Sequence, residues 1–180
     1  CLADAPVFAT ARAALAYDDH ARKLVLDLKR GGRRDGLKAF GGWMARAGAE
    51  ALAEADFVAP TPLHWTRLLE RRFNQSAWLA ASLSRASGVK LSVDALKRVK
   101  ATPIQGGLSA DGRRRNVQGA FQVRGSRKRL VEGRKVLLVD DVLTTGATAE
   151  ACTRALRRAG AACVDVVTLA RVAGPRAAPI

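Results

Sequence analysis

The stretch that decides the fold is VLLVDDVLTTGAT, which runs from Val136 to Thr148. Its first four residues are β-branched or aliphatic, which is typical of a parallel strand covered on both faces. Two adjacent aspartates follow where a buried strand is expected to end, and a small-residue loop comes next. In open α/β sheets the ligand crevice lies beyond the carboxyl ends of the strands. The stretch therefore predicts an acidic pair and a loop at the edge of a binding site.

The acidic pair is Asp140 and Asp141. Adjacent strand residues point to opposite faces, so the two carboxylates need not share one site. At least one should face the crevice, where it can accept hydrogen bonds from ligand hydroxyls or contact the water shell of a magnesium ion. We predict that both aspartates bind ligand, act in catalysis and hold Mg²⁺ through water.

The loop after the pair is predicted to bind a phosphate, because it combines backbone N–H groups and hydroxyls with the positive end of a helix. The alternative is that one threonine only caps that helix and that the aspartates favour its N-terminus. This alternative leaves the second carboxylate and the open backbone at the glycine without a role. No GxxxxGK[ST] or GxGxxG motif is present. The predicted phosphate-binding residues are Thr144, Thr145, Gly146, Ala147 and Thr148.

Outward from this stretch, strand patterns alternate with helical patterns, which predicts a parallel α/β sheet flanked by helices. Residues 7–17 are expected to be a mixed, alanine-rich approach to the first helix. Strands are predicted at Phe57–Ala59, Val136–Val139 and Val164–Leu169, and helices are predicted from Asp18 or Asp19 to Gly31, Leu37 to Ala53, Asn74 to Gly88, and around Cys152–Ala159, with Gly160 ending the last.

Residues Thr102 to Arg129 are rich in glycine and arginine, with one possible strand at Ala120–Val123. Long loops of this kind in compact domains are usually functional or disordered. We predict a flexible lid loop on which Arg113 brings a cation to a leaving phosphate group. The alternative, a disordered basic loop, stays open.

Composition limits the partners and the setting of the chain. Its 180 residues fit one domain, and 48% hydrophobic content without a long apolar run predicts a soluble, cytoplasmic protein with no membrane insertion. The formal charge of +15 favours an anionic partner, while 5% aromatic residues argue against base stacking. Weak duplex DNA binding through Arg127, Lys128 and Arg129 is one expectation, and a basic surface that only aids solubility is the other.

At this point the sequence closely resembles a known family signature. Val136 to Thr148 is similar to the phosphoribosyl pyrophosphate (PRPP) signature of type I phosphoribosyltransferases. Over nearly the whole chain the sequence also resembles the ComF/GntX family of competence-associated, phosphoribosyltransferase-like proteins. Ala59 to Ala80 carries that family's Pro-x-Pro-Leu-His and Arg-Gly-Phe-Asn-Gln pattern, with Arg72 in place of the glycine. The further matching positions are Arg98, Thr102, Gln105, Leu108, Arg113 and Asn116.

The resemblance implies particular roles. Asp140 and Asp141 would hold the ribose 2- and 3-hydroxyls, and the loop from Thr144 would hold the 5-phosphate. It also implies a hood segment over residues 1–55 and a PRPP-binding core over residues 56–172 of one domain. An N-terminal zinc ribbon is common in the family, and Cys1 resembles its last ligand, so zinc is expected only with a preceding ribbon. Further PRPP contacts are implied at Thr61, Arg67, Arg71 and Gln105.

The expected activity is phosphoribosyl transfer to a nitrogen nucleophile with release of pyrophosphate, linked to competence, DNA uptake and nucleotide metabolism. The chain needs no covalent nucleophile for this chemistry, and His20 and His64 are too isolated to form a triad. The alternative is a PRPP or nucleotide sensor, or a DNA-uptake accessory protein, on a catalytically silent fold. A protein partner from the competence machinery is a further expectation.

Overall fold

A central parallel sheet carries the architecture of the chain, which is described in a computed structural model over residues 6–30, 34–101 and 110–172. Its four strands lie in the order β1-β6-β5-β2, and a separate antiparallel pair is formed by β3 and β4. The strands are β1 (Ala11–Ala16), β2 (Phe57–Pro60), β3 (Leu96–Arg98), β4 (Phe121–Val123), β5 (Lys135–Leu143) and β6 (Cys163–Arg171). The predicted parallel α/β sheet flanked by helices is confirmed.

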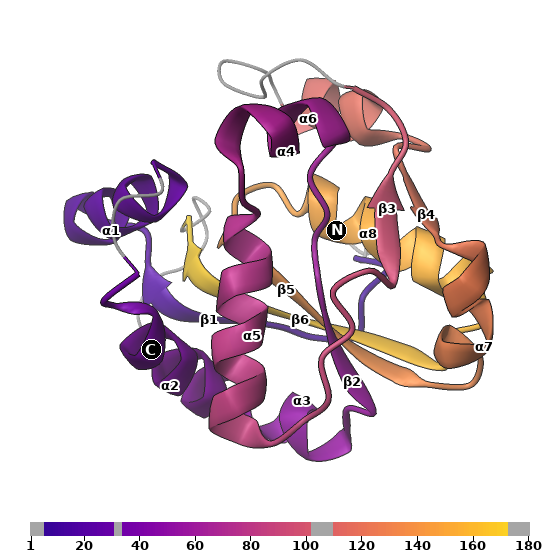
Figure 1. Cartoon of the computed structure of the whole chain (residues 1–180), viewed down its shortest axis with the longest axis horizontal. Coiled ribbons are helices and arrows are strands. Elements are labelled where there is room, and N and C mark those ends of the chain that lie inside the picture. Colours follow the sequence, from indigo (N-terminus) through magenta and orange to yellow (C-terminus); the bar gives the residue numbers. More distant parts are fainter. Residues whose placement is uncertain (1–5, 31–33, 102–109, 173–180) are drawn as a thin grey trace.

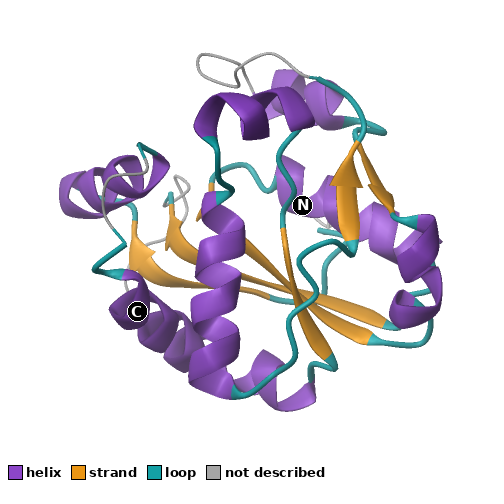
Figure 2. Ribbon diagram, viewed as in Figure 1, coloured by secondary structure: helices purple, strands orange, loops and turns teal. Residues whose placement is uncertain are grey.

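Helices cover both faces of this sheet (Figure 2). They are α1 (Asp19–Lys29), α2 (Leu37–Ala47), α3 (Ala49–Glu54), α4 (Trp65–Arg71), α5 (Gln75–Ser87), α6 (Ala110–Val117), the 3₁₀ turn η1 (Gly125–Arg127), α7 (Lys128–Val131) and α8 (Ala147–Arg158). Helices α2 and α5 pack on one face, and α8 packs on the other (Figure 1).

Strand β5 divides the hydrophobic core in two because its side chains alternate. Val136 and Leu138 face the core that contains α8, β3 and β4. Leu137 and Val139 face the core that contains α1, α2 and α5. All four residues are buried, as the apolar run predicted.

Helix α2 approaches α5 closely at a glycine. A Cβ atom placed on Gly41 would lie 2.4 Å from the Ser82 Oγ and 2.8 Å from the Ser82 backbone carbonyl. The Ser82 hydroxyl donates a hydrogen bond to the Leu37 carbonyl across the same contact. Gly42, one residue later, faces solvent, and a Cβ atom placed there would have no neighbour within 4 Å.

Several element boundaries differ from the sequence predictions. No strand was predicted in the mixed, alanine-rich residues 7–17, but Ala11–Ala16 is a strand paired with β6. The single helix predicted from Leu37 to Ala53 is two helices that meet at Gly48, where the backbone leaves the helical region. Strand β5 extends four residues beyond Val139 because β6 pairs with it as far as Leu143.

The segment from 102 to 129 contains more regular structure than the sequence indicated. Helix α6, strand β4 and η1 lie within it, and β4 matches the embedded strand predicted at Ala120–Val123. Residues 102–109 lie outside the described residues, so the predicted lid loop cannot be followed there.

Candidate functional site

The site forms where β2 ends and its neighbour β5 continues. The backbone N–H of Thr61 donates the last hydrogen bond between them, to the Val139 carbonyl. Beyond this point the chain turns away into α4, so one side of β5 is released from pairing at Asp140. Pro60 ends β2 at the sheet edge, where a missing N–H is tolerated.

Asp140 is half-buried and held by three donors on one oxygen. Its Oδ1 accepts hydrogen bonds from the Thr61 hydroxyl at 2.7 Å, the Ser76 hydroxyl at 2.9 Å and the Asp141 backbone N–H at 2.9 Å. Burial, and then the neighbouring charge of Asp141, raise the pKa of Asp140 to about 6, although these hydrogen bonds act in the opposite direction. The other oxygen, Oδ2, receives no hydrogen bond from the described residues. It is therefore the oxygen with more capacity left to accept a hydrogen bond from a ligand.

Asp141 is buried and has a different set of partners. Its Oδ2 lies 3.1 Å from the Lys29 Nζ and accepts a hydrogen bond from the Gln75 Nε2 at 3.3 Å. Its Oδ1 accepts from the Val142 backbone N–H at 2.8 Å. The two carboxylates thus have separate environments, as the alternation of a strand predicts.

The N-terminus of α5 supplies most of this support. Asn74 caps the helix by accepting from the Ser76 N–H, and its amide donates to the Thr61 carbonyl at 2.9 Å. This cap places Gln75 and Ser76 against the acidic pair. The sequence predicted that a helix begins at Asn74 but did not assign Gln75 or Ser76 to the site.

The loop after β5 has the geometry of an anion site. Gly146 adopts φ 79° and precedes the first residue of α8, Ala147, and no side chain caps the helix. The alternative in which Thr144 or Thr145 serves as the cap was wrong. Thr144 is exposed, and the buried Thr145 hydroxyl has no hydrogen-bond partner among the described residues. The start of α8 thus has no side-chain hydrogen bond at its cap position, which leaves its first-turn N–H groups able to bind an anion.

Two arginines lie near one another, and one of them, Arg98, lies near Asp140. The Arg98 guanidinium lies over the Phe121 ring, 5.3 Å from its centre, and burial, then the charge of Arg67, lower the pKa of Arg98. The charges of Cys152 and Asp140 act in the opposite direction on the pKa of Arg98, so both residues lie near its guanidinium. Arg67 was predicted as a ligand contact, and it lies near Arg98. Arg98 matches the family pattern, but the sequence did not assign it to the site. Two cations that repel one another are suited to a ligand with two phosphates.

The remaining predicted residues are placed less fully. Gln105 lies outside the described residues, and Arg113 is described only as part of the α6 backbone. Arg71 is half-buried in the last turn of α4. Arg72, which replaces the family's glycine, ends that helix with φ 63°, a left-handed conformation that glycine adopts more easily.

The residues at the crevice fit a magnesium ion only in part. The described residues hold no group of three or more His, Cys, Asp or Glu side chains that could bind a metal. Carboxylate oxygens suit Mg²⁺, which keeps several waters and takes other ligands from substrate phosphates. Asp140 Oδ2 would be the contact, and the remaining ligands would come from water and phosphate.

Comparison with known proteins identifies the family of the chain. The sequence profile described as "Phosphoribosyl transferase domain" matches residues 74–179. Competence protein F of Haemophilus influenzae is 40% identical over 114 residues, which are 63% of this chain and 49% of that protein. The DNA utilization protein YhgH of Escherichia coli K12 is 40% identical over 116 residues, which are 64% of this chain and 49% of that protein. The chain spans about half the length of these curated relatives.

Solved structures agree on the fold. The glutamine PRPP amidotransferase from B. subtilis, complexed with ADP and GMP, has a TM-score of 0.53 at 22% identity, over 80% of this chain and 30% of that one. An allosteric regulatory enzyme of purine biosynthesis has a TM-score of 0.51 at 24% identity over the same shares. No helix in the described part of the chain is long and apolar enough to span a bilayer. The chain belongs to the phosphoribosyl transferase domain family, as a ComF-type, phosphoribosyltransferase-like member.

Proposed function

We propose that the chain binds PRPP with Mg²⁺ and transfers its phosphoribosyl group to a nitrogen nucleophile. The observation that carries the proposal is the placement of Asp140 and Asp141 on β5 immediately before the uncapped N-terminus of α8. In this proposal the hydroxyl acceptors and the phosphate site belong to one continuous stretch of nine residues, from Asp140 to Thr148, close to the point where β2 ends.

Each part of the site has one task in this proposal. Asp140 and Asp141 accept hydrogen bonds from the ribose hydroxyls, and the loop from Thr144 to Thr148 holds the 5-phosphate. Arg67 and Arg98 stabilise the pyrophosphate. Thr61 acts mainly through Asp140, because its hydroxyl and backbone N–H are both engaged within the protein.

The reaction needs positioning and charge stabilisation more than a protein nucleophile. The bond between the anomeric carbon and the pyrophosphate oxygen breaks, and its electron pair leaves with pyrophosphate. The lone pair of the nitrogen forms the new bond, and the nitrogen releases its proton. Cations at the leaving group and carboxylates near the electron-poor sugar stabilise the charge separation.

The test is calorimetry of Mg-PRPP binding to the wild type and to the double variant Asp140→Asn/Asp141→Asn. Each lost charged acceptor should cost about 1.5 to 3 kcal/mol, which weakens binding tenfold or more. Asp94→Asn is the control, because this exposed carboxylate pairs with Arg127 elsewhere on the surface. Equal affinity in the double variant would refute the assignment. Pyrophosphate release with a panel of bases and amines then separates an enzyme from a PRPP sensor.

A second candidate function that we propose is contact with DNA, in keeping with the name of the relative called DNA utilization protein YhgH. A hollow of about 400 Å³ between α6 and α8 gathers four arginines against one glutamate: Arg114, Arg115, Arg154, Arg158 and Glu150. Arg158 also lines a neighbouring hollow with Lys128. Together they form a basic track along α8 that suits a phosphate backbone. Of the three residues predicted for DNA contact, Lys128 adjoins this track, whereas Arg127 pairs with Asp94.

A further inference from the structure

Both oxygens of Asp141 are occupied by groups of the protein itself. Oδ2 meets the Lys29 ammonium at 3.1 Å and the Gln75 amide at 3.3 Å, while Oδ1 takes the Val142 N–H. Asp140 differs, because its three donors share Oδ1, and Oδ2 accepts no hydrogen bond from the described residues. A ligand hydroxyl would therefore find an oxygen without a hydrogen bond from the described residues at Asp140, whereas at Asp141 it would compete with protein donors on both oxygens.

Only one of the three donors to Asp141 is free to move. The Val142 N–H belongs to the same strand, within β5. Gln75 is 5% exposed, in the first turn of α5, and Asn74 caps that turn. Lys29 has a flexible side chain that is 32% exposed, against 9% for Asp141. The ammonium is therefore the donor that can leave at the lowest cost.

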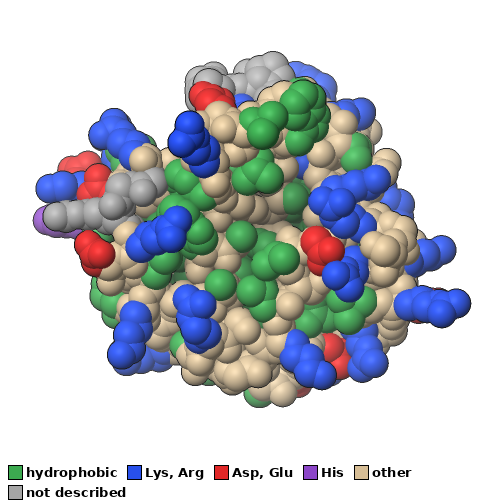
Figure 3. All heavy atoms as spheres, in the orientation of Figure 1, with side chains coloured by type: hydrophobic (Ala, Val, Ile, Leu, Met, Phe, Trp, Pro, Cys, Tyr) green, Lys and Arg blue, Asp and Glu red, His purple; other side chains and the backbone are tan. Residues whose placement is uncertain are grey.

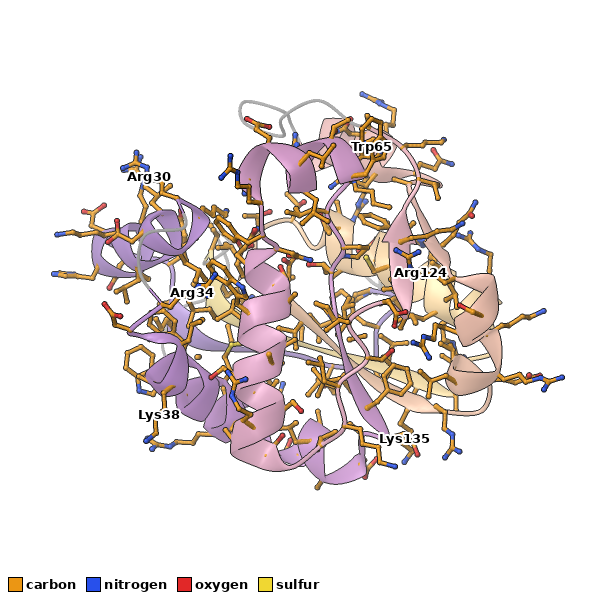
Figure 4. All side chains as sticks on the ribbon, in the orientation of Figure 1. Arg30, Arg34, Lys38, Trp65, Arg124 and Lys135 are labelled. Atoms are coloured by element: carbon orange, nitrogen blue, oxygen red, sulfur yellow. The ribbon has the colours of Figure 1, made fainter. Side chains whose placement is uncertain are left out.

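The position of Lys29 connects this exchange to a whole helix. Lys29 lies in the last turn of α1, and Arg30, which follows it, is the residue at which that helix ends (Figure 4). Helix α1 is otherwise anchored by one apolar side, formed by Ala21, Val25 and Leu28. The Lys29–Asp141 pair is thus a polar link between the end of α1 and the acidic pair on the sheet.

We propose that Lys29 is a gate on the sugar site: it occupies the hydroxyl-binding position of Asp141 and must release it before a ribose phosphate can bind fully. This rests on the proposed function, since it assumes that the hydroxyls of the ligand meet the acidic pair. Lys29 is accordingly a competitor of the ligand, not one of its contacts. Binding of ligand frees the last turn of α1 from the sheet.

The gate lowers the apparent affinity by the fraction of molecules in which it is open. If about one molecule in ten has released Asp141, the apparent dissociation constant is about tenfold higher than the intrinsic one. Removing the ammonium should remove this penalty. The expected direction is opposite to that of an ordinary binding lysine, whose loss weakens binding of an anionic ligand.

The experiment measures ribose 5-phosphate and Mg-PRPP affinity in the wild type, Lys29→Met and Lys23→Met. Lys23 is exposed on the same helix, so its replacement removes the same charge without touching Asp141. We expect Lys29→Met to bind both ligands several-fold to tenfold more tightly, and Lys23→Met to bind them as the wild type does or slightly more weakly. Weaker or unchanged binding by Lys29→Met would overturn the gate.

Hydrogen exchange separates failure of the gate from failure of the proposed function. The Arg30 N–H donates to the Leu26 carbonyl in the last turn of α1. Without ligand, Lys29→Met and Asp141→Asn should each raise exchange in this turn, and the double variant should raise it no further. Unchanged exchange refutes the gate even if PRPP binds. If exchange rises but neither ligand binds any variant, the polar link exists and the proposed function, together with the gating role, is wrong.

Discussion

Asp140 is a carboxylate whose surroundings favour its protonated form. Its pKa is raised from 3.8 to about 6, so the folded protein binds this proton more tightly than the unfolded chain does. The resulting stability is fully present below about pH 4 and is lost as the pH rises through about 6. At neutral pH the ionised carboxylate therefore opposes folding by about 2 to 3 kcal/mol.

This residue predicts a variant that is more stable than the wild type. Asp140→Asn keeps an oxygen acceptor for Thr61 and Ser76 but carries no charge. We expect its free energy of unfolding at pH 8 to exceed that of the wild type by about 1 to 2 kcal/mol, and the difference to vanish near pH 4. Urea titrations across this pH range measure the effect.

Asp141→Asn provides the contrast. The Lys29 ammonium compensates the charge of Asp141, and the Gln75 amide donates a hydrogen bond to the same carboxylate. This variant should be less stable than the wild type at pH 8, by about 1 to 3 kcal/mol. If both variants shift stability in the same direction, the two carboxylates do not have the separate environments described above.

At the scale of elements, the contact between α2 and α5 depends on the absence of one side chain. Gly41→Ala should push a methyl group into the backbone of Ser82 and destabilise the fold by about 1 to 3 kcal/mol. Gly42→Ala lies on the exposed side of the same helix and should stabilise it by about 0.5 to 1 kcal/mol. Thermal unfolding of the two single variants measures the difference, and equal melting temperatures would contradict this packing.

The elements also show which parts of the fold the sequence could predict. Strand β5, the loop at Gly146 and α8 were predicted because their signals are local: an apolar run, a glycine and a helical repeat. Strand β1 reads ARAALA, which has little β propensity, and it is a strand because β6 pairs with it. Strand β3 has three residues, too few to show any alternation.

The acidic pair of the candidate site was found from sequence, but its partners were not. Gln75 and Ser76 follow the cap residue of α5, so the local pattern marks them only as the start of a helix. It gives no sign that they also donate hydrogen bonds to the acidic pair. Lys29 meets Asp141 across more than a hundred residues, in a contact that no local pattern indicates. Arg98 lies on the short strand that was missed. The partners of the acidic pair were missed mainly because they lie far from it along the chain, and less because of their residue types.

At the scale of the whole molecule, the charge of +15 is distributed over the surface, and Lys and Arg side chains outnumber Asp and Glu on the face shown in Figure 3. The track along α8 concentrates this charge on the opposite layer. If DNA binds through the general positive charge of the surface, its affinity should fall by the same amount wherever an arginine is removed. If DNA binds along the track, its affinity should fall only when an arginine of the track is removed.

Duplex DNA binding tested at several salt concentrations distinguishes them. Arg115→Ser/Arg158→Ser should weaken binding and reduce the slope of log affinity against log salt by about 0.9 for each DNA phosphate that the variant no longer neutralises. Arg46→Ser/Arg85→Ser removes the same charge from the exposed faces of α2 and α5 and should change the slope little. If both double variants lose the same DNA affinity, the general charge of the surface explains the binding and the track does not. If the wild type binds no DNA even at low salt, DNA contact is not a function of the chain.

The strand order has a consequence for how the chain is made. Strand β2 pairs with β5, and β1 pairs with β6, so neither early strand has its sheet partner until the last third of the chain exists. At a synthesis rate of about 5 to 20 residues per second, β2 waits several seconds for β5 to emerge from the ribosome. Until then its apolar residues lack the strand that covers one edge of β2, and only the helices and the short segment at Leu91 can pack against them. We expect nascent chains that stop before Lys135 to aggregate or to recruit chaperones, and chains extended past Arg171 to fold.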